Sequence, residues 1–257
     1  MKEQIIDIQT ATGKMETFIT HPEDKGRYPA VILYMDVWGV REVLYDLARR
    51  IGTVGYCALV PDFYYRQGRI RTDFRDEDGR AISLSKLDKA TQEKVLAPQK
   101  LLTDTMVIED TGAILQFIDG QESVKPGPVG TIGYCMGGRH VLEVGAHYPQ
   151  RIRAMASLHG TSIISDREES PHRIVDKLQG EVYCGFAETD PYAPLSMVDE
   201  WNTQIKRCPV KYRCEIHPGA HHGYALPDRD LHDKRASERD WELVFDMFRR
   251  QLSPYAS

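Results

Sequence analysis

Short runs of consecutive apolar residues alternate along this chain with longer amphipathic stretches. Two of the runs, AVILYM at 30–35 and CALVP at 57–61, are apolar throughout, as parallel strands are when helices cover both faces of their sheet. The first two segments instead alternate between apolar and polar positions, which is typical of edge strands. The pattern as a whole predicts eight strands, at residues 3–9, 15–20, 30–35, 57–61, 129–134, 154–158, 181–186 and 212–217.

Between these strands the apolar residues recur at helical spacing. The last helical pattern has Ser237 as a candidate N-cap and Trp241, Val244, Phe245 and Phe248 at core spacing. Helices are predicted at residues 41–54, 98–118, 138–148, 195–206 and 237–252. Strands and helices that alternate in this way indicate an α/β fold, with a mostly parallel sheet, helices on both faces and two antiparallel strands at the start.

The residues from 65 to 97 interrupt this alternation. They are rich in charge, contain no run of strand type, and are too long for an ordinary connection in a compact domain. Two interpretations are open, namely a lid over a functional site or a solvated loop with one short helix near residues 85–95. We expect one domain over residues 1–257, in which residues 65–97 are a lid or an insertion.

Composition narrows the class of protein. The 257 residues include 33 basic and 38 acidic side chains, and the net charge of −5 argues against a nucleic-acid-binding surface. No apolar run is long enough to span a membrane, and the N-terminus lacks the apolar segment of a signal peptide. The five cysteines form neither a CxxC motif nor a Cys/His cluster. We therefore expect a cytoplasmic protein without disulfides or bound metal, which binds neither nucleic acid nor membranes.

A candidate catalytic motif lies at the fifth predicted strand. The sequence GYCMG at 133–137 places Cys135 between a strand and a helix start, in the pattern of a nucleophile elbow with cysteine replacing serine. Side chains two residues before and after Cys135 would collide with the neighbouring strand and helix, which explains the glycines. The helix N-terminus favours thiolate over thiol, and the amide of Met136 is free to stabilise an oxyanion. The alternative is an inert core cysteine in a Gly-rich turn.

An elbow nucleophile needs a carboxylate and a histidine, in that order along the chain. Asp190 and His222 each follow a predicted strand, so both are expected with Cys135 at the carboxyl edge of the sheet. Glu188 and His221 are the alternatives for the two roles. We favour Asp190 because it is shorter and precedes a proline, and His222 because a glycine and an aromatic residue follow it. A surface histidine pair is the remaining alternative.

Four segments of the chain resemble the dienelactone hydrolase family, which is carboxymethylenebutenolidase-like and belongs to the α/β-hydrolase superfamily. They are MDVWGVR at 35–41, VPDFYYR at 60–66, GTIGYCMGG at 130–138 and PGAHHGY at 218–224, and the resemblance extends over residues 5–252. It implies an α/β-hydrolase fold with eight mostly parallel strands and a triad of Cys135, His222 and Asp190. The chain is closer to a broad subgroup that has GYCMGGR, a His-Gly pair at 159–160 and Ser-Pro-His at 170–172.

Two positions depart from the family pattern. Asp36 stands where the family has a glutamate that holds the resting thiol, and capping of the helix near Arg41 is its alternative role. Leu226 stands where the archetypal enzymes have an arginine that grips the substrate carboxylate. Arg139 is a candidate replacement, and an ion pair with a neighbouring helix is the alternative. Without such an anchor, neutral lactones or aryl esters are the expected substrates.

The expected activity is hydrolysis of a small ester or lactone, without a cofactor. Cys135 would attack the acyl carbonyl while the amides of Met136 and Val37 hold the oxyanion. His222, oriented by Asp190, would protonate the leaving group and later activate water.

Three further residues, Trp38, Tyr64 and Arg66, are candidates for lining the pocket, with core packing as the alternative. Two other functions stay open. A thioesterase or acyltransferase would use the same triad, and a non-enzymatic binding protein would use only the scaffold. The sequence leaves the natural substrate and the oligomeric state open.

Overall fold

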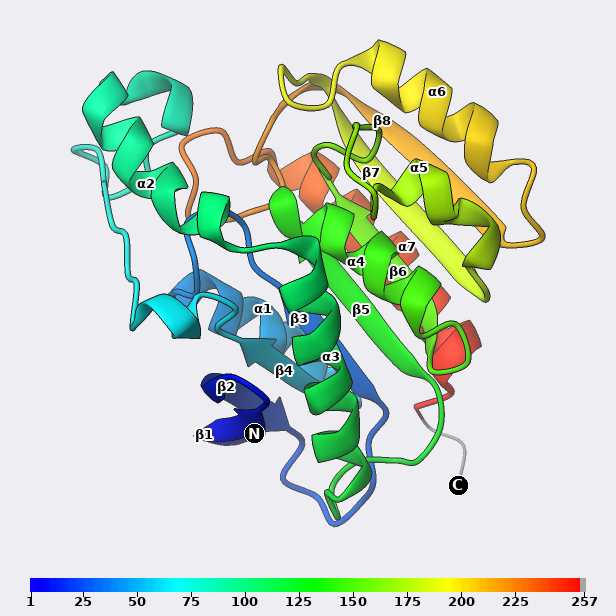
Figure 1. The fold of residues 1–257 in the computed structure, drawn as a ribbon. Helices are drawn as coiled ribbons and strands as arrows, with labels where there is room; N and C mark the ends of the chain where they lie inside the picture. The colour runs from blue at the N-terminus through cyan, green and yellow to red at the C-terminus, as the bar shows by residue number, and fades with distance from the viewer. Residues whose placement is uncertain (255–257) are drawn as a thin grey trace.

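The computed structural model describes residues 1–254, which form an eight-stranded sheet in the order β1-β2-β4-β3-β5-β6-β7-β8 (Figure 1). Strand β1 pairs antiparallel with β2 and β2 with β4, and every other neighbouring pair is parallel. The eight predicted strands and their directions are thereby confirmed. Their bounds are β1 (Lys2–Thr10), β2 (Gly13–His21), β3 (Ala30–Tyr34), β4 (Cys57–Pro61), β5 (Val129–Tyr134), β6 (Ile152–Leu158), β7 (Glu181–Thr189) and β8 (Lys211–His221).

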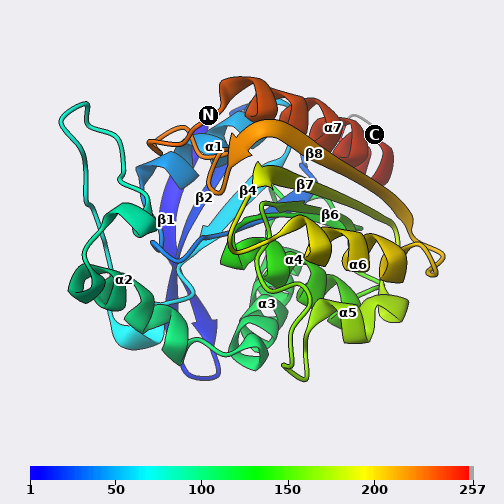
Figure 2. The same ribbon diagram turned by 90° about the horizontal axis from the view of Figure 1, so that it is seen from above.

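Helices cover both faces of this sheet, as the apolar strands require. Figure 2 shows α1 (Glu42–Thr53) and α7 (Lys234–Leu252) on one face. The other face carries α3 (Asp104–Asp119), α4 (Met136–His147), α5 (Pro171–Ile174) and α6 (Leu195–Ile205). Helix α2 (Lys89–Leu101) lies outside both layers. Three single 3₁₀ turns complete the elements, at η1 (Tyr65–Gln67), η2 (Leu84–Lys86) and η3 (Val175–Lys177).

The helix predicted at residues 98–118 is wrong at its start. Pro98 belongs to the end of α2, and the chain is extended at Leu102 before α3 begins. The side chain of Thr103 accepts a hydrogen bond from the amide of Met106 at 3.2 Å, so Thr103 is the N-cap of α3. A capping hydroxyl satisfies an amide that has no partner inside the helix, and it starts a new helix where apolar periodicity alone suggests continuation.

The start of the last helix also differs from the prediction. Asp233, rather than Ser237, is the N-cap of α7, and its carboxylate accepts from the amide of Ala236 at 3.0 Å. Ser237 lies inside the helix, where its hydroxyl donates to the carbonyl of Ala225. Aspartate and serine are both good caps, and the carboxylate four residues earlier takes the role here because its geometry closes the first turn.

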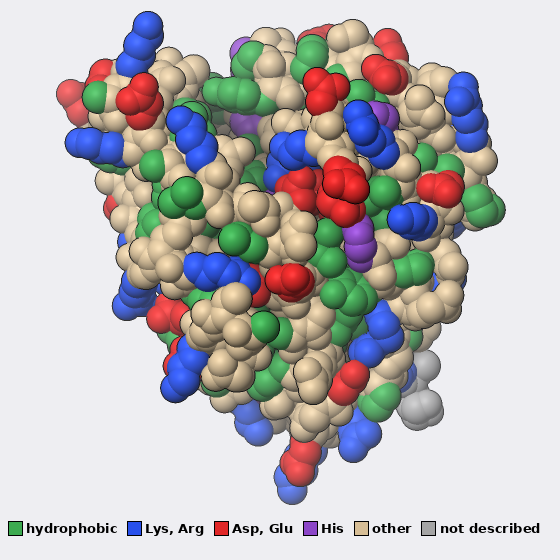
Figure 3. All heavy atoms as spheres, in the orientation of Figure 1, with side chains coloured by type: hydrophobic (Ala, Val, Ile, Leu, Met, Phe, Trp, Pro, Cys, Tyr) green, Lys and Arg blue, Asp and Glu red, His purple; other side chains and the backbone are tan. Residues whose placement is uncertain are grey.

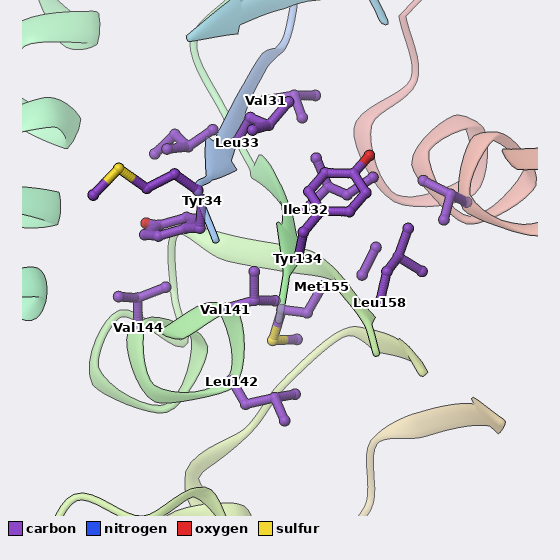
Figure 4. Packing of buried hydrophobic residues seen from close by; sticks show 14 of the residues in the cluster. Val31, Leu33, Tyr34, Ile132, Tyr134, Val141, Leu142, Val144, Met155 and Leu158 are labelled. Carbon is purple, nitrogen blue, oxygen red and sulfur yellow. The ribbon is translucent and has the colours of Figure 1, made fainter. Parts of the chain in front are cut away.

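The core is continuous from α4 through the central strands to α7. Tyr34 at the end of β3 and Tyr134 at the end of β5 are fully buried and extend on opposite sides of the sheet (Figure 4). Tyr34 shares a hydrogen bond of 2.9 Å with Thr111 on α3, so its hydroxyl is satisfied inside the core. Each fully buried large apolar side chain stabilises the fold by roughly 1.5–3 kcal/mol. This packing holds the junction between β5 and α4 in one place.

The winding of the sheet reverses between β3 and β5. After β3 the chain adds β4 on one side, and it then crosses to place β5 on the other side. Loops that follow two such strands separate from each other and leave a crevice at the carboxyl edge of the sheet. Asp36 and Val37 follow β3, and Cys135 follows β5, so the sequence-predicted site lies at this reversal.

The surface carries charges of both signs. Figure 3 shows Lys and Arg side chains interspersed with Asp and Glu side chains over the visible face. Among residues 1–254, no helix is both long and apolar enough to cross a bilayer.

Candidate active site

Cys135 lies at the sharp turn between β5 and α4. Its backbone has φ 56° and ψ −116°, a left-handed conformation that is strained for a residue with a side chain. A Cβ atom on Gly133 would lie 2.2 Å from the carbonyl oxygen of Gly137, and one on Gly137 would lie 2.3 Å from that of Tyr34. The predicted reason for both glycines is confirmed, because no larger residue fits at either position.

Hydrogen bonds fix the backbone of the elbow to the end of β6. The amide of Cys135 donates to the carbonyl of Leu158 and to Nδ1 of His159, both at 3.1 Å. Its carbonyl accepts from the amides of Gly138 at 3.0 Å and Thr161 at 3.1 Å. The backbone that carries the side chain of Cys135 is therefore fixed at both its amide and its carbonyl.

His222 and Asp190 are directly bonded. Nδ1 of His222 lies 2.6 Å from Oδ2 of Asp190, whose other oxygen accepts from the amides of Tyr192 at 2.8 Å and Ala193 at 3.1 Å. The thiol of Cys135 lies close enough to the imidazole of His222 to affect its pKa. Burial alone would lower the pKa of His222, but the nearby sulfur of Cys135 and the hydrogen bond to Asp190 raise this pKa to about 10. The arrangement favours the imidazolium form of His222.

The alternatives for these two roles lie elsewhere. The carboxylate of Glu188 is exposed and accepts from the amide of Gly219 at 2.8 Å. His221 is exposed at the rim of the cavity described next. His217, which the sequence assigned to a strand, is in β8 and its Nε2 lies 2.6 Å from Asp240.

A cavity of about 550 Å³ opens beside Cys135 and His222. Its walls come from the loops that follow β3, β5, β6, β7 and β8, with Val37 and Trp38 on one side and Tyr192 on another. The predicted assignment of Trp38 to the pocket agrees with this lining. Residues 83–85 and Leu96 contribute a further wall, so the segment 65–97 covers part of the cavity. A space of this size fits a small organic molecule.

Arg229 is a charged cavity residue that sequence reasoning missed. Its guanidinium lies over the ring of Trp38, 4.6 Å from the centroid, and its Nη2 donates to the carbonyl of Ile82 at 3.1 Å. Its Nη1 is buried and has no hydrogen-bond partner among the described residues. Burial lowers the pKa of Arg229, with Asp36 acting in the opposite direction. A buried cation with a free donor is a ready partner for an anion.

The family pattern predicts an anchoring arginine in this loop, but at position 226 and not at position 229. The expected place for an anchoring arginine is Leu226, which also lines the cavity. Two consecutive turns, with hydrogen bonds from Leu226 to Gly223 and from Arg229 to Leu226, bring the later residue back to the cavity. The number of residues between His222 and Arg229 does not show that the chain turns back to the cavity.

Asp36 is engaged away from the thiol. Its two oxygens bind Arg41 at 2.7 and 3.0 Å, and its Oδ1 also accepts from the amide of Trp38 at 3.0 Å. Arg41 in turn binds Asp228 at 2.8 Å. Asp36 still touches the cavity. The alternative role, capping of the helix near Arg41, is wrong, because Asp36 binds the guanidinium of Arg41 and accepts from no amide of α1. A bidentate arginine pair in a buried place holds the turn after β3 rigidly.

Three other predicted pocket residues, Arg139, Arg66 and Tyr64, do not line the cavity. Arg139 is buried and binds Asp104 at 2.8 Å and Glu143 at 3.0 Å, which is the ion-pair alternative. Arg66 binds the buried Asp110 at 2.7 Å. Their positive charges are therefore already compensated inside the fold.

Tyr64 is also buried, and it acts on the site through the backbone. Its hydroxyl donates to the carbonyl of Val37 at 3.1 Å, so it supports the turn after β3 without lining the cavity. In the same region Tyr34 and Gly133 are register partners in β3 and β5, and Gly137 packs against Tyr34. The amides of Val37 and Met136, which follow these strands, are thereby brought to the same edge.

One cluster of potential metal ligands occurs within residues 1–254. Asp104, His140 and Glu143 offer ligand atoms within 4.8 Å of one another. Arg139 and Arg167 already bind these carboxylates, at 2.8 and 3.0 Å from Asp104. Guanidinium groups supply the positive charge that a cation would bring, so this cluster is an internal ion-pair network beneath α4.

The sheet order, the strand–turn–helix elbow at the winding reversal and the helices on both faces define an α/β-hydrolase fold with a cysteine at the elbow. The sequence profile of the dienelactone hydrolase family matches residues 15–252. The chain belongs to the dienelactone hydrolase family, as the four motifs indicated. The expected enzyme class, a hydrolase of carboxylic esters and lactones, is confirmed at the level of the family.

Relatives align over almost the whole chain. A protein of Synechocystis sp. that is assigned the name carboxymethylenebutenolidase is 27% identical over 258 residues, which cover 98% of each chain. A Bradyrhizobium protein assigned the name 2-oxo-3-(5-oxofuran-2-ylidene)propanoate lactonase is 22% identical, with 96% of this chain and 94% of that one covered. The crystal structure of a protein of Klebsiella pneumoniae, assigned as a dienelactone hydrolase, has a TM-score of 0.81 at 22% identity, over 96% of this chain and 98% of that one.

Proposed function

We propose that this chain hydrolyses a small ester or lactone through a catalytic triad of Cys135, His222 and Asp190 and a covalent acyl-enzyme. The observation that carries the proposal is the chain of contacts beside the cavity. Cys135 and His222 line the same cavity, and Nδ1 of His222 lies 2.6 Å from Oδ2 of Asp190. A nucleophile, a base and an orienting carboxylate in this order are the parts that nucleophilic acyl transfer requires.

In the first half-reaction the thiolate of Cys135 attacks the acyl carbonyl, and a C–S bond forms while the carbonyl oxygen becomes an oxyanion. The amides of Met136 and Val37 stabilise that oxyanion, since both lie at the carboxyl edge beside the elbow. When the C–O bond breaks, the imidazolium of His222 protonates the leaving alkoxide. Neutral His222 then takes a proton from water, which attacks the thioester and releases the acid.

The cysteine favours esters and lactones over amides as substrates. From a tetrahedral intermediate, a thiolate leaves more readily than an amine but not more readily than an activated alkoxide. The tetrahedral intermediate formed from an amide would therefore revert to the amide substrate. The intermediate formed from an enol ester, an aryl ester or a lactone proceeds to the acyl-enzyme.

The substrate class follows from Arg229. Its positive charge in the cavity wall and its position over Trp38 support a substrate that carries a carboxylate. Leu226 in place of an arginine had led to the expectation of neutral substrates, and Arg229 replaces that expectation with an anionic substrate. The Bradyrhizobium relative is named for a lactone that also carries a carboxylate. We therefore propose an anionic lactone or ester as the preferred substrate.

We further propose that the segment 65–97 acts as a lid within a single domain. Ala81 forms a β-bridge with Arg229, with backbone hydrogen bonds of 2.7 Å to Asp228 and 3.1 Å from Asp230. The hydroxyl and the amide of Ser83 both donate to the carboxylate of Asp230. The segment is thus attached to the loop that carries both His222 and Arg229, and it limits the access of water to the cavity.

A substrate screen tests the proposed function. Purified protein is assayed with lactones, aryl esters and acyl thioesters, and Cys135→Ala serves as the blank. We expect turnover of lactones or aryl esters that the blank lacks. Turnover confined to thioesters would replace the proposal with a thioesterase. Equal turnover by the Cys135→Ala protein would contradict the cysteine mechanism.

A further inference from the structure

His159 occupies a strained and completely buried position in the wall of the cavity. It follows β6 directly, has a φ of 39° and is 0% exposed. A residue with a side chain in this backbone region costs on the order of 1–3 kcal/mol. Such a conformation persists only where the surrounding contacts hold it, so the contacts of His159 indicate what the position is for.

The imidazole of His159 contacts the nucleophile through the backbone. Its Nδ1 accepts from the amide of Cys135 at 3.1 Å, and its own amide donates to the carbonyl of Gly185 at 2.7 Å. Because Nδ1 accepts, the ring proton is on Nε2, which is buried without a hydrogen-bond partner among the described residues. Burial, with the charges of His222 and Arg229, lowers the pKa of His159 well below its ordinary value. The ring is therefore neutral.

The same ring also contacts the base. The rings of His159 and His222 meet edge to face with centroids 4.9 Å apart. On another side His159 meets Tyr224, two residues after His222, with centroids 5.4 Å apart. One neutral imidazole thus touches the backbone of the nucleophile and the side chain of the histidine that must reach it.

A buried carboxylate supports this contact from the far side. The hydroxyl of Tyr224 donates to Asp240 on α7 at 2.6 Å, and Tyr183 on β7 donates to the same carboxylate at 2.5 Å. His217 on β8 lies 2.6 Å from it. Asp240 is 0% exposed, so these bonds join α7, β7, β8 and the histidine loop inside the core. Tyr224 cannot move away from His159 without breaking a buried, charge-assisted bond.

We propose that His159 is a positioning residue, which sets the distance between the thiol of Cys135 and the imidazole of His222 by holding the elbow amide with its Nδ1. The network of Tyr224 and Asp240 holds His159 in that place. His159 does not touch the reacting atoms and stays neutral, so it acts through Cys135 and His222. This inference rests on the proposed function, because it gives a role to His159 only if Cys135 is the nucleophile.

A pair of matched substitutions tests the role of Nδ1. In His159→Asn the side-chain oxygen takes the place of Nδ1, and asparagine tolerates a positive φ. In His159→Gln the polar atoms reach the place of Nε2, so the acceptor at Nδ1 is lost and the amide of Cys135 keeps only its bond to the carbonyl of Leu158. The measurement is the second-order rate constant for alkylation of Cys135 by iodoacetamide, obtained by peptide mapping, together with kcat and KM on a reactive aryl ester.

We expect His159→Asn to keep both rate constants within about threefold, and His159→Gln to lower alkylation of Cys135 and kcat by about 10²-fold with little change in KM. Thermal unfolding is recorded for both variants, since a merely structural histidine would change the melting temperature and leave the alkylation rate of the folded protein unchanged. Equal rates in the two folded variants would overturn the proposal. If His159→Gln does not fold, His159→Gly replaces it, because glycine accepts the positive φ and also lacks the acceptor.

The two failures are distinguishable. Alkylation of Cys135 needs no substrate, so it reports on His159 even if the substrate class is wrong. Failure of the proposed function appears in the unmodified protein, as turnover that does not depend on Cys135. Failure of the role of His159 appears as equal alkylation in the Asn and Gln variants of a protein whose turnover does depend on Cys135.

Discussion

A hydrogen bond of 2.6 Å joins Nδ1 of His222 to Oδ2 of Asp190. Asp190 follows β7 and His222 follows β8, and these two strands are parallel neighbours. The last residues of the two strands, Thr189 and His221, are register partners. The side chain of Asp190 is 0% exposed, and two backbone amides hold its other oxygen. Sheet pairing therefore places the histidine and its carboxylate side by side, and the buried carboxylate fixes which ring nitrogen faces Cys135.

We expect Asp190→Asn to lower kcat by up to about 10⁴-fold, because an amide no longer selects the required tautomer or stabilises the imidazolium. Glu188→Gln is the matched control, since Glu188 binds only the exposed amide of Gly219 in the same loop region. It should change kcat by less than about threefold, in line with a surface contact. The measurement is steady-state kinetics on an aryl ester. A larger loss in the Glu188 variant would transfer the role of the acid to Glu188.

Cys135 should be the first cysteine that iodoacetamide alkylates at neutral pH. Burial raises the pKa of Cys57 to about 12 and also raises the pKa of Cys184, so both stay protonated. Burial raises the pKa of Cys208 and Cys214 as well. Cys135 alone combines a helix N-terminus with an imidazolium partner. Peptide mapping over a time course checks this, and labelling of Cys57 or Cys208 first, with activity retained, would refute the mechanism.

The pH profile of kcat/KM should have an alkaline limb near pH 10, where the pKa of His222 lies in the folded protein. The imidazolium that protonates the leaving group is present below this pKa and is lost as pH rises through it. An ordinary histidine would lose its proton near about pH 6.5. Rates on a neutral ester are measured from about pH 6 to 11, with the Cys135→Ala blank subtracted at each pH. In Asp190→Asn the limb should move to lower pH, because one of the bonds that raise the pKa is lost. An alkaline limb near pH 6.5 in the unmodified protein would contradict the proposed pairing of the His222 imidazolium with the Cys135 thiolate.

Arg229→Met should lower kcat/KM on a carboxylated lactone by tenfold or more, which corresponds to about 1.4 kcal/mol. Activity on the methyl ester of the same lactone should change little, because the ester lacks the charge that Arg229 pairs with. Arg69→Met removes the same charge from a side chain that is 66% exposed, and it is the control for a general charge effect. If the unmodified protein does not distinguish the free acid from its methyl ester, Arg229 is not a carboxylate anchor.

Asp36→Asn should lower the free energy of unfolding by about 3 kcal/mol, because it breaks a buried bidentate pair and leaves part of the charge of Arg41 uncompensated. The alkylation rate of Cys135 in the folded variant should stay within about twofold, since the hydrogen bonds of Asp36 go to Arg41 and Trp38. Urea denaturation gives the first quantity and peptide mapping the second. Glu42→Gln, which affects an exposed pair with Arg49, is the control. A large change in alkylation would restore Asp36 as a partner of the thiol.

The sequence predicted those features that depend on neighbours along the chain. Continuous apolar runs indicated the buried parallel strands, because a strand covered on both faces must be apolar at every position. The glycines around Cys135 indicated the elbow, because the turn leaves no room for a Cβ atom at 133 or 137. The positions of Asp190 and His222 after strands indicated a shared edge, because parallel strands end on the same side.

Contacts between distant segments were decided only by the tertiary structure. Arg229 reaches the cavity because two tight turns bring it back past Leu226, and Arg139 is withdrawn because Asp104 on another helix binds it. His159 gains its contacts with Cys135 and His222 only when β6 lies beside β5. The free energy of a buried charge or ring depends on the groups that surround it in space. Spacing along the chain determines which backbone elements form, and the packing of those elements determines which polar side chains face the cavity.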